Sequence, residues 1–282
     1  MATADFRLRS LCLLMTAMVL GCIALRPSMA AEACGVEAPC QVQGGLYRTS
    51  PPAKWDGRSI LPTVLFFHGY QGSAAEGMEN IGLRRAFSDL GILLVFPDSG
   101  PPGSWMHDTH DAGARDEIEY TRTVIGDLKS RWPVDGDHLW VAGFSDGGFM
   151  VWKLACHGRG EFRAYVALSG AFVEPLPQQC EGGPVNLLEF HGLTDEMVPM
   201  EGRSIQGVFT QGDVFESFAV LRKLDHCRRD PDRYEVRGPF AVRQWETSCA
   251  TGKRLAMAIH SGGHEMLEGW VELAWEWTKA SH

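Results

Sequence analysis

The chain has 282 residues, of which 45% are apolar and 22% are charged, and its formal net charge at pH 7 is −9. This length suits one α/β domain, and the balance of apolar and charged residues is that of a folded globular protein. An acidic chain without a basic stretch argues against nucleic acid or an anionic membrane surface as a partner.

The beginning of the chain has the pattern of a secretory signal peptide. Arg7 and Arg9 form a short basic start, and Leu11–Leu25 is an uncharged, mostly apolar run that is too short to span a bilayer comfortably. Ser28–Ala30 then places small residues at the two positions that a signal peptidase recognises. The sequence therefore predicts a signal peptide over residues 1–30 and export of the remainder.

Two other fates of this segment stay open. Val19–Cys22 loosely resembles a lipobox, which would place a lipid anchor on Cys22, and a transmembrane anchor is a further alternative. Leu20 fits the lipobox poorly and the apolar run continues past Cys22, so we expect a secreted or periplasmic protein without stable membrane insertion. The mature chain, residues 31–282, then forms a single domain with 23 basic and 34 acidic residues.

The cysteines also indicate export. Six of the eight follow the leader, and an even number in an exported chain favours disulfides. Six cysteines allow many pairings, and a buried free thiol at Cys156 is an alternative. No C-x-x-C pair is present, which argues against a zinc site. Pairing of nearest neighbours would join Cys34 to Cys40, Cys156 to Cys180 and Cys227 to Cys249.

Short apolar runs alternate with longer amphipathic stretches along the mature chain. Near-continuous apolar runs of four or five residues favour the strands of a parallel sheet that is buried on both faces. The expected strands are Thr63–Phe67, Ile92–Phe96, Leu139–Ala142, Ala164–Leu168, Asn186–Phe190 and Leu255–Ile259.

The amphipathic stretches predict helices. Asp116–Trp132, for example, carries its apolar residues on one stripe, has acidic residues at its start and stops before Pro133. Alternating strands and helices predict a three-layer α/β/α sandwich with a mostly parallel central sheet and right-handed crossovers. The other expected helices are Gly147–Cys156, Asp213–Leu224 and Met266–Lys279.

Gly143–Gly147 matches the pattern G-x-S-x-G, in which a serine sits on a sharp turn between a strand and a helix. The glycines are needed because the serine torsions are strained and side chains two positions away would clash. The turn exposes the hydroxyl group at the carboxyl end of the sheet. We therefore expect Ser145 to be a nucleophile; the alternative is a glycine-rich surface turn.

His68–Gly72 follows the first expected strand directly. A strand that ends in His-Gly before a loop is where backbone N–H groups can bind a developing oxyanion. The candidates for this role are the N–H groups of Tyr70 and of Asp146, which follows the serine. We expect His68 to be a structural hydrogen-bonding residue rather than a catalytic one.

His191–Asp195 follows the fifth expected strand. A carboxylate just past that strand can accept the proton on imidazole Nδ1 and hold the ring in the tautomer that a general base needs. Asp195 is the candidate for this acid. The alternative is that Asp195 only forms a turn or caps a helix.

His260–His264 follows the last expected strand, and its glycines allow the second histidine to reach over the serine. His264 is therefore the candidate base. The rivals are His260, which packing would hold at the strand end, and His226, which lies next to a cysteine and a basic cluster. The chain order serine, aspartate, histidine is that of α/β-hydrolases.

A long loop, Ser99–Asp116, is rich in proline, glycine and polar residues and lies at the same edge of the expected sheet. Trp105 could stack on an acyl or aromatic group, which makes it the candidate substrate-binding residue, or it could simply pack. We expect the histidines and aspartates of this loop to be solvated rather than to bind a metal. They are His107, Asp108, His110 and Asp111.

Together these motifs resemble the secreted polyhydroxybutyrate depolymerase and feruloyl esterase family of α/β-hydrolases. The resemblance covers most of the mature chain. Its segments are Cys34–Cys40, Val64–Ala74, Arg115–Cys156, Leu187–Pro199 and Gly262–His264.

The resemblance implies a catalytic triad of Ser145, Asp195 and His264, hydrolysis of carboxylic esters and no cofactor. Its implied partner is a small or oligomeric ester substrate, and it leaves the oligomeric state open. A peptidase or thioesterase of the same fold, or a non-catalytic binding protein on this scaffold, are the alternatives.

The sequence departs from the family at the pocket. Members often carry cysteine at the position of Tyr70 and asparagine at that of Asp146, and many continue with Trp-Pro where Glu265 and Met266 follow the histidine. No separate polymer-binding module is evident. We therefore expect soluble esters or oligomers as substrates rather than an insoluble polymer.

Overall fold

A ten-stranded sheet forms the centre of the computed structural model, which describes residues 34–105, 114–205 and 209–280. These residues belong to one unit, Ala33–His282. The expected signal peptide, the lipid anchor at Cys22 and the loop histidines and aspartates between His107 and Asp111 lie outside the described residues. Within the described part of the chain, the helices are too short or too polar to cross a bilayer.

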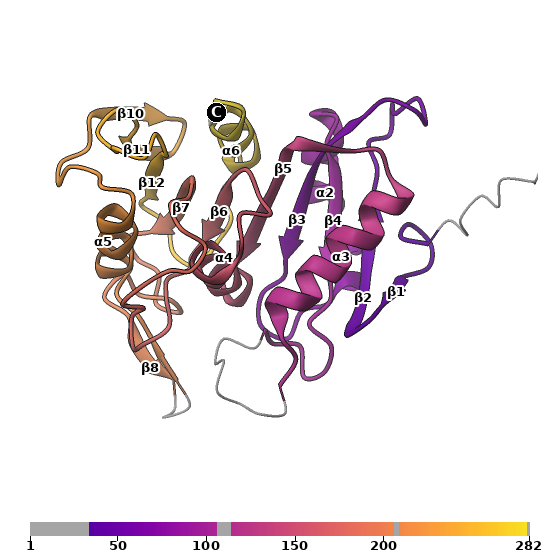
Figure 1. The fold of residues 1–282 in the computed structure, drawn as a ribbon, viewed down its shortest axis with the longest axis horizontal. Helices are drawn as coiled ribbons and strands as arrows, with labels where there is room; N and C mark the ends of the chain where they lie inside the picture. The colour runs from indigo at the N-terminus through magenta and orange to yellow at the C-terminus, as the bar shows by residue number, and fades with distance from the viewer. Residues whose placement is uncertain (1–33, 106–113, 206–208, 281–282) are drawn as a thin grey trace, which may run out of the picture. The chain divides into compact units, whose positions relative to one another are not determined.

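The six strands at the centre of the sheet run parallel to one another (Figure 1). They are the strands that the apolar runs predict, because side chains on both faces are buried. In spatial order they are β4 (Leu93–Pro97), β3 (Leu61–Phe67), β5 (Val134–Phe144), β6 (Tyr165–Leu168), β7 (Leu187–Gly192) and β12 (Leu255–His260).

Antiparallel strands that the apolar runs did not predict extend the sheet at both edges. Beyond β4 lie β2 (Gly45–Ser50) and β1 (Cys40–Val42), and beyond β12 lie β11 (Phe240–Trp245) and β10 (Arg233–Arg237). A separate two-stranded ribbon is formed by β8 (Arg203–Ile205) and β9 (Phe209–Gln211).

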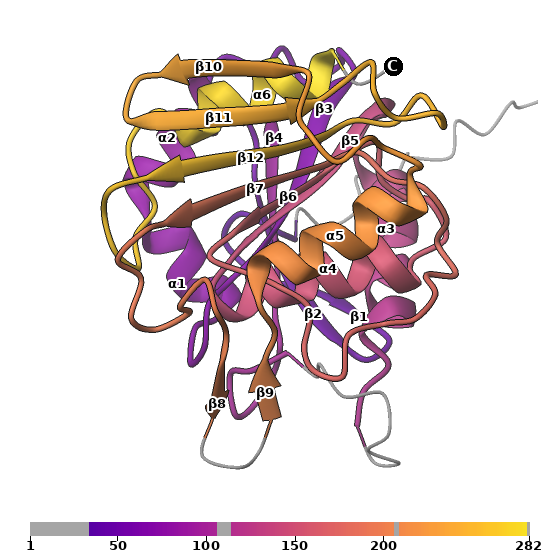
Figure 2. The same ribbon diagram turned by 90° about the vertical axis from the view of Figure 1, so that its left-hand side faces the viewer.

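Helices cover both faces of the sheet (Figure 2). Two separate clusters of buried apolar side chains lie between the sheet and these helices, so the protein has the expected three layers. One face is covered by α3 (Glu117–Arg131), α4 (Asp146–His157) and α5 (Val214–Leu224). The other is covered by α1 (Ala74–Glu79), α2 (Ile81–Asp89) and α6 (Trp270–Lys279).

The helix ends follow local capping chemistry. The side chain of Asp116 accepts hydrogen bonds from the N–H groups of Ile118 and Glu119 and so starts α3, close to the expected start. The last helix is shorter than expected and begins at Trp270 rather than at Met266. Gly269 has a φ of 90° directly before it, a left-handed conformation that interrupts the helix.

Three disulfides join cysteines that are neighbours in sequence. Cys34 pairs with Cys40, Cys156 with Cys180 and Cys227 with Cys249. Cys156 is therefore not a free thiol, and its bond ties the end of α4 to the segment before β7. Closed loops of some twenty residues typically gain about 2–4 kcal/mol of stability from such a bond.

Candidate active site

Ser145 lies on the sharp turn between β5 and α4. Its backbone has a φ of 58° and a ψ of −118°, which a residue other than glycine adopts only under strain. The Ser145 N–H donates to the carbonyl oxygen of Leu168 at 2.9 Å, and this bond holds the turn against the end of β6. This conformation places the hydroxyl group at the carboxyl ends of the parallel strands.

The two outer glycines of this motif are required by close backbone contacts. A Cβ on Gly143 would overlap the carbonyl of Gly147, and a Cβ on Gly147 would overlap the carbonyl of Phe67 at the end of β3. Each obstacle is backbone, which cannot rotate away as a flexible side chain can. The glycines therefore allow the turn to sit tightly against its neighbouring strand.

The side chains of Ser145, His264 and Asp195 form one chain of hydrogen bonds. Nε2 of His264 lies 2.9 Å from Oγ of Ser145, and Nδ1 of His264 lies 2.8 Å from Oδ2 of Asp195. A carboxylate only accepts, so Nδ1 carries the proton and Nε2 is free to accept from the serine hydroxyl. The three residues follow β5, β7 and β12, whose carboxyl ends share one edge of the sheet.

Asp195 is buried and well supplied with donors. Its Oδ1 accepts from the N–H groups of Met197 at 2.9 Å and Val198 at 2.8 Å. Burial by itself raises the pKa of Asp195, but the hydrogen bonds from His264, Val198 and Ser169 outweigh burial and hold this pKa below its ordinary value. Asp195 is thus an anion aimed at the imidazole.

The loops that carry Asp195 and His264 are bonded to each other. The N–H of Thr194 donates to the carbonyl of Gly262 at 3.1 Å, and that of Leu193 donates to the carbonyl of His260 at 2.9 Å. A Cβ on Gly192 would overlap the carbonyl oxygens of this second loop, so glycine permits the contact. These contacts hold the two loops together.

The imidazole of His264 remains accessible from the surface, with about 20% of its side chain exposed. One face packs against the ring of Phe144, with the ring centroids 4.7 Å apart. Phe144 precedes the serine, so the same turn positions both the nucleophile and the ring beside it.

The two rival histidines have other contacts. His260 is buried at the end of β12, where burial lowers its pKa and its Nδ1 accepts from the N–H of Gly262 at 3.2 Å. His226 lies just past α5, and its carbonyl accepts from the N–H of Ala250 next to the Cys227–Cys249 disulfide. Of the three candidates, His264 is the one that the structure brings to the serine.

The turn after β3 runs beside the serine. A Cβ on Gly69 would lie 3.5 Å from Cβ of Ser145, so the backbone that leads to Tyr70 borders the hydroxyl group. On the other side, Asp146 is the first residue of α4, at the positive end of the helix dipole. Both backbone positions expected to bind an oxyanion therefore flank Ser145.

The expected role of Trp105 in stacking on substrate is corrected by its placement. The indole is only 1% exposed, its Nε1 donates to the carbonyl of His68 at 2.8 Å, and its ring packs against those of Phe67 and His68. These contacts and the burial of the ring leave the indole inside the protein, with almost no exposed surface for a substrate. Trp105 holds the turn after β3 in place, through packing that a loop sequence alone did not distinguish from substrate binding.

His68 and Asp146 take part in the same support. The ring of His68 lies 2.8 Å from the carbonyl of Gly69 and accepts from the N–H of Ser99, and burial lowers its pKa. The carboxylate of Asp146 accepts from the N–H of Trp105 at 2.9 Å. His68 is therefore a structural residue, as the sequence predicts.

Sequence reasoning missed one buried polar pair close to the triad. Glu189 and His191 on β7 are both fully buried, and they lie 2.9 Å apart. The available signal was a charged residue within the otherwise apolar strand run NLLEF. Among all the described residues, no three His, Cys, Asp or Glu side chains are grouped so that they could hold a metal ion.

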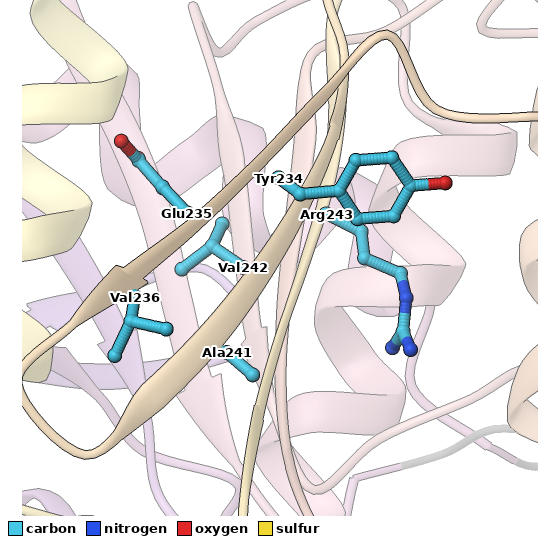
Figure 3. Close-up of a pocket in the computed structure, with 6 residues that line it drawn as sticks. All are labelled: Tyr234, Glu235, Val236, Ala241, Val242 and Arg243. Carbon is cyan, nitrogen blue, oxygen red and sulfur yellow. The ribbon is translucent and has the colours of Figure 1, made fainter.

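A surface depression lies away from these residues, on the antiparallel hairpin at the edge of the sheet (Figure 3). None of the residues predicted for the site lines it, and its walls are hairpin side chains. They are Tyr234, Glu235, Val236, Ala241, Val242 and Arg243.

Comparison with known proteins gives esterases as relatives. The chain is 26% identical over 76% of its length to esterase NocK of Nocardia uniformis subsp. tsuyamanensis, and 25% identical over 81% to feruloyl esterase B of Piromyces equi. It is 33% identical over 57% to a probable feruloyl esterase C of Aspergillus niger. The chain covers 67%, 44% and 59% of these three relatives, and no family model matches it.

Solved structures share the fold. An acetyl xylan esterase from Aspergillus awamori superposes with a TM-score of 0.59 at 14% identity, over 83% of this chain and 93% of that one. A carboxylesterase from Bacillus cereus superposes with a TM-score of 0.54, also at 14% identity, over 84% of this chain and 94% of the other. The protein has the α/β-hydrolase fold, and its sequence relatives are named esterases.

Proposed function

We propose that this protein is a secreted serine esterase that hydrolyses carboxylic esters through Ser145, His264 and Asp195. The observation that carries the proposal is the continuous chain of hydrogen bonds from Oδ2 of Asp195 through both nitrogens of His264 to Oγ of Ser145. The sequence similarity to named esterases supports the same chemistry. The paired cysteines and the expected signal peptide, residues 1–30, support export of a single catalytic domain, residues 31–282.

The reaction proceeds by acyl transfer. His264 Nε2 takes the proton from Ser145 as its oxygen attacks the ester carbonyl carbon, and the imidazolium that forms is stabilised by the anion of Asp195. The imidazolium then protonates the leaving alcohol, and an acyl-serine remains. Water attacks this acyl-enzyme and gives its proton to His264, which releases the acid and restores the serine.

The tetrahedral intermediates carry a negative oxygen that needs donors. The proposed donors are the backbone N–H groups of Tyr70 and Asp146, which is supported by the closeness of Gly69 to Ser145 and by the start of α4 at Asp146. In comparable enzymes, removal of one such donor costs roughly 3 kcal/mol of transition-state stabilisation. No metal or organic cofactor is required for any step of this chemistry.

Exposed apolar side chains close in sequence to the proposed site residues support an ester with an apolar part. Tyr70, Leu193 and Met197 are among the few large apolar side chains that are more than half exposed, and each lies within two residues of a proposed site residue or is one itself. Such side chains can cover an aromatic ring or an alkyl chain. We therefore propose feruloyl, short-chain acyl or hydroxyalkanoate oligomer esters as substrates.

Two other functions are separable by experiment. A peptidase or thioesterase of this fold would prefer amide or thioester substrates over the matched oxygen esters. A binding protein on this scaffold would turn over none of them, and it would not be labelled by a fluorophosphonate at the serine.

The variant Ser145→Ala tests the proposal. Loss of the nucleophile should lower kcat for p-nitrophenyl butyrate roughly 10⁴- to 10⁶-fold, the range found when other hydrolases lose their serine. Fluorophosphonate labelling should disappear while the melting temperature is kept. Ser130→Ala is the matched control, because Ser130 lies on the exposed part of α3 and should leave activity unchanged. Wild-type activity in the Ser145→Ala protein would refute the assignment.

A further inference from the structure

The buried carboxylate of Glu189 connects three parts of the structure around the triad. Its Oε1 accepts from the N–H of Gly170 at 3.1 Å and contacts Nδ1 of His191 at 2.9 Å. Its Oε2 accepts from Nε1 of Trp152 at 2.9 Å. Trp152 belongs to α4, the helix that starts at the nucleophile, and Gly170 follows β6.

His191 continues this network toward the acid of the triad. Its Nε2 lies 2.8 Å from the carbonyl oxygen of Val198, whose own N–H donates to Oδ1 of Asp195 at 2.8 Å. The same Nε2 lies 3.9 Å from Oδ2 of Asp195, the oxygen that accepts from His264. His191 thus holds the backbone of the loop that aims Asp195.

The contacts of His191 favour its doubly protonated form. A carbonyl oxygen only accepts, so Nε2 carries a proton, and Nδ1 faces a carboxylate that also receives two other donors. Burial lowers the pKa of His191, but the hydrogen bond and charge of Glu189 outweigh burial, and this pKa lies above its ordinary value. Burial also raises the pKa of Glu189, which favours its neutral form, so we assign the charged pair from the geometry: the Glu189 carboxylate is surrounded by the donors of Trp152, Gly170 and His191.

We propose that His191 is a positioning residue for the esterase reaction, which holds the loop of Asp195 through Val198 and adds a fixed positive charge beside the triad. This inference rests on the proposed function of Ser145, Asp195 and His264. The Nε2 hydrogen bond supplies the position and the charge supplies an electrostatic effect, so the two contributions can be separated by substitution.

The electrostatic effect follows from the shared carboxylate oxygen. Both imidazoles lie within 4 Å of Oδ2 of Asp195. A cation at His191 disfavours a second positive charge beside the same carboxylate, so its removal should move the acid limb of kcat/KM to higher pH. The ionisable groups that face His191 or the triad from the surrounding elements are Glu189, Asp195, His260, His264 and Glu265.

Two substitutions divide the contacts of His191. In His191→Asn the amide nitrogen can replace Nδ1 and keep the bond to Glu189, but the bond to Val198 is lost. In His191→Gln the longer side chain can replace Nε2 and keep the bond to Val198, but the bond to Glu189 is lost. Both variants remove the charge. His138→Gln is the control, since His138 also pairs with a carboxylate, Asp135, but lies away from the site and is partly exposed.

The experiment measures kcat and KM for p-nitrophenyl butyrate from about pH 5 to 9, with circular dichroism to verify folding. We expect His191→Asn to lower kcat about 10- to 100-fold with little change in KM, and His191→Gln to stay within about threefold of wild type. In both variants the acid limb of kcat/KM should move up by about half to one pH unit, whereas His138→Gln should match wild type.

The inference would be overturned if both His191 variants kept wild-type kcat and an unmoved acid limb. It would also be overturned if both variants lost kcat equally with the acid limb unmoved, because that result indicates a merely structural role. If the His191 variants give either of these results while Ser145→Ala abolishes turnover, the inference about His191 fails and the proposed function stands. For variants that do not fold, nitrogen-15 NMR of wild-type histidines decides, because His191 should show two slowly exchanging ring N–H groups. A bare ring nitrogen on His191 would overturn it.

Discussion

A buried aspartate lies beside each end of the strand pair β7 and β12, but the two aspartates have different surroundings. At the carboxyl ends, Asp195 is surrounded by donors from its own loop and by His264. Near the amino ends, Asp225 is equally buried, but among the described residues its carboxylate accepts one hydrogen bond, from the N–H of Val185 at 3.2 Å. Its other oxygen has no described hydrogen-bond donor.

The contrast shows that burial alone does not make a carboxylate useful for catalysis. Burial raises the pKa of both side chains, but donors reverse the effect at Asp195 and leave its pKa below the ordinary value. At Asp225, burial raises the pKa to about 7 against the weaker effects of Val185 and Lys253. One end of the strands holds an anion ready for an imidazole, and the other holds a carboxyl group that is protonated in acid.

A substitution at the carboxyl end should have the largest effect. In Gly147→Ala the new Cβ would meet the backbone carbonyl of Phe67, so the turn that carries Ser145 must shift. We expect kcat for p-nitrophenyl butyrate to fall about 100-fold. The free energy of unfolding in urea should also fall, by about 1–3 kcal/mol.

The control for this change is Gly126→Ala on the exposed side of α3, where an added Cβ meets nothing within 4 Å. It should leave kcat unchanged and raise the free energy of unfolding by about 0.5–1 kcal/mol, because alanine favours the helix. Equal kcat in the two alanine variants would show that the tight turn is not needed to place Ser145.

The centre of the fold was predictable from the sequence, but its edges were not. The six parallel strands are buried on both faces, so each forms a continuous apolar run, and the expected strands overlap all six. By contrast, β10 alternates polar and apolar residues, and none of its positions is buried. Such a strand is stabilised by its neighbours rather than by a pattern of its own.

The site also has a part that was predictable from the sequence and a part that was not. Ser145, Asp195 and His264 sit on glycine-rich turns directly after strands, and this local pattern predicted their positions. The network of Glu189 and His191 depends on Trp152 and Gly170, which reach it from other elements. No local pattern reports such a convergence, because it arises only when the sheet and α4 pack together.

The contrast between the two strand ends can be sharpened with Asp225→Asn. Between about pH 4 and 7 the folded wild type holds a proton at Asp225 that the unfolded chain has released, so this group makes stability fall as the pH rises. The asparagine does not titrate. At pH 8 the free energy of unfolding of the variant should therefore exceed that of wild type by about 2–4 kcal/mol. This gain should vanish near pH 4.

The measurement is urea unfolding at several pH values with the disulfides intact. Asp230→Asn, a change at an exposed aspartate five residues further along the chain, should follow the wild-type curve. Esterase activity should be unchanged in both variants, because neither residue contacts the triad. A gain in stability that is the same at pH 4 and pH 8 would contradict the raised pKa of Asp225.

The smallest effects should come from the hairpin depression, which tests whether the chemistry is confined to the carboxyl ends of the parallel strands. Tyr234 and Val236 line it with 66% and 77% of their surfaces exposed (Figure 3). The double substitution to threonine keeps strand propensity and removes the apolar surface, so the free energy of unfolding should change by less than about 0.5 kcal/mol. We expect kcat/KM to stay at the wild-type value for both butyryl and feruloyl esters. A selective loss with the feruloyl ester would instead make this outer hairpin part of the substrate site, and the polar convergence around Ser145 would then be only half of what recognises an ester.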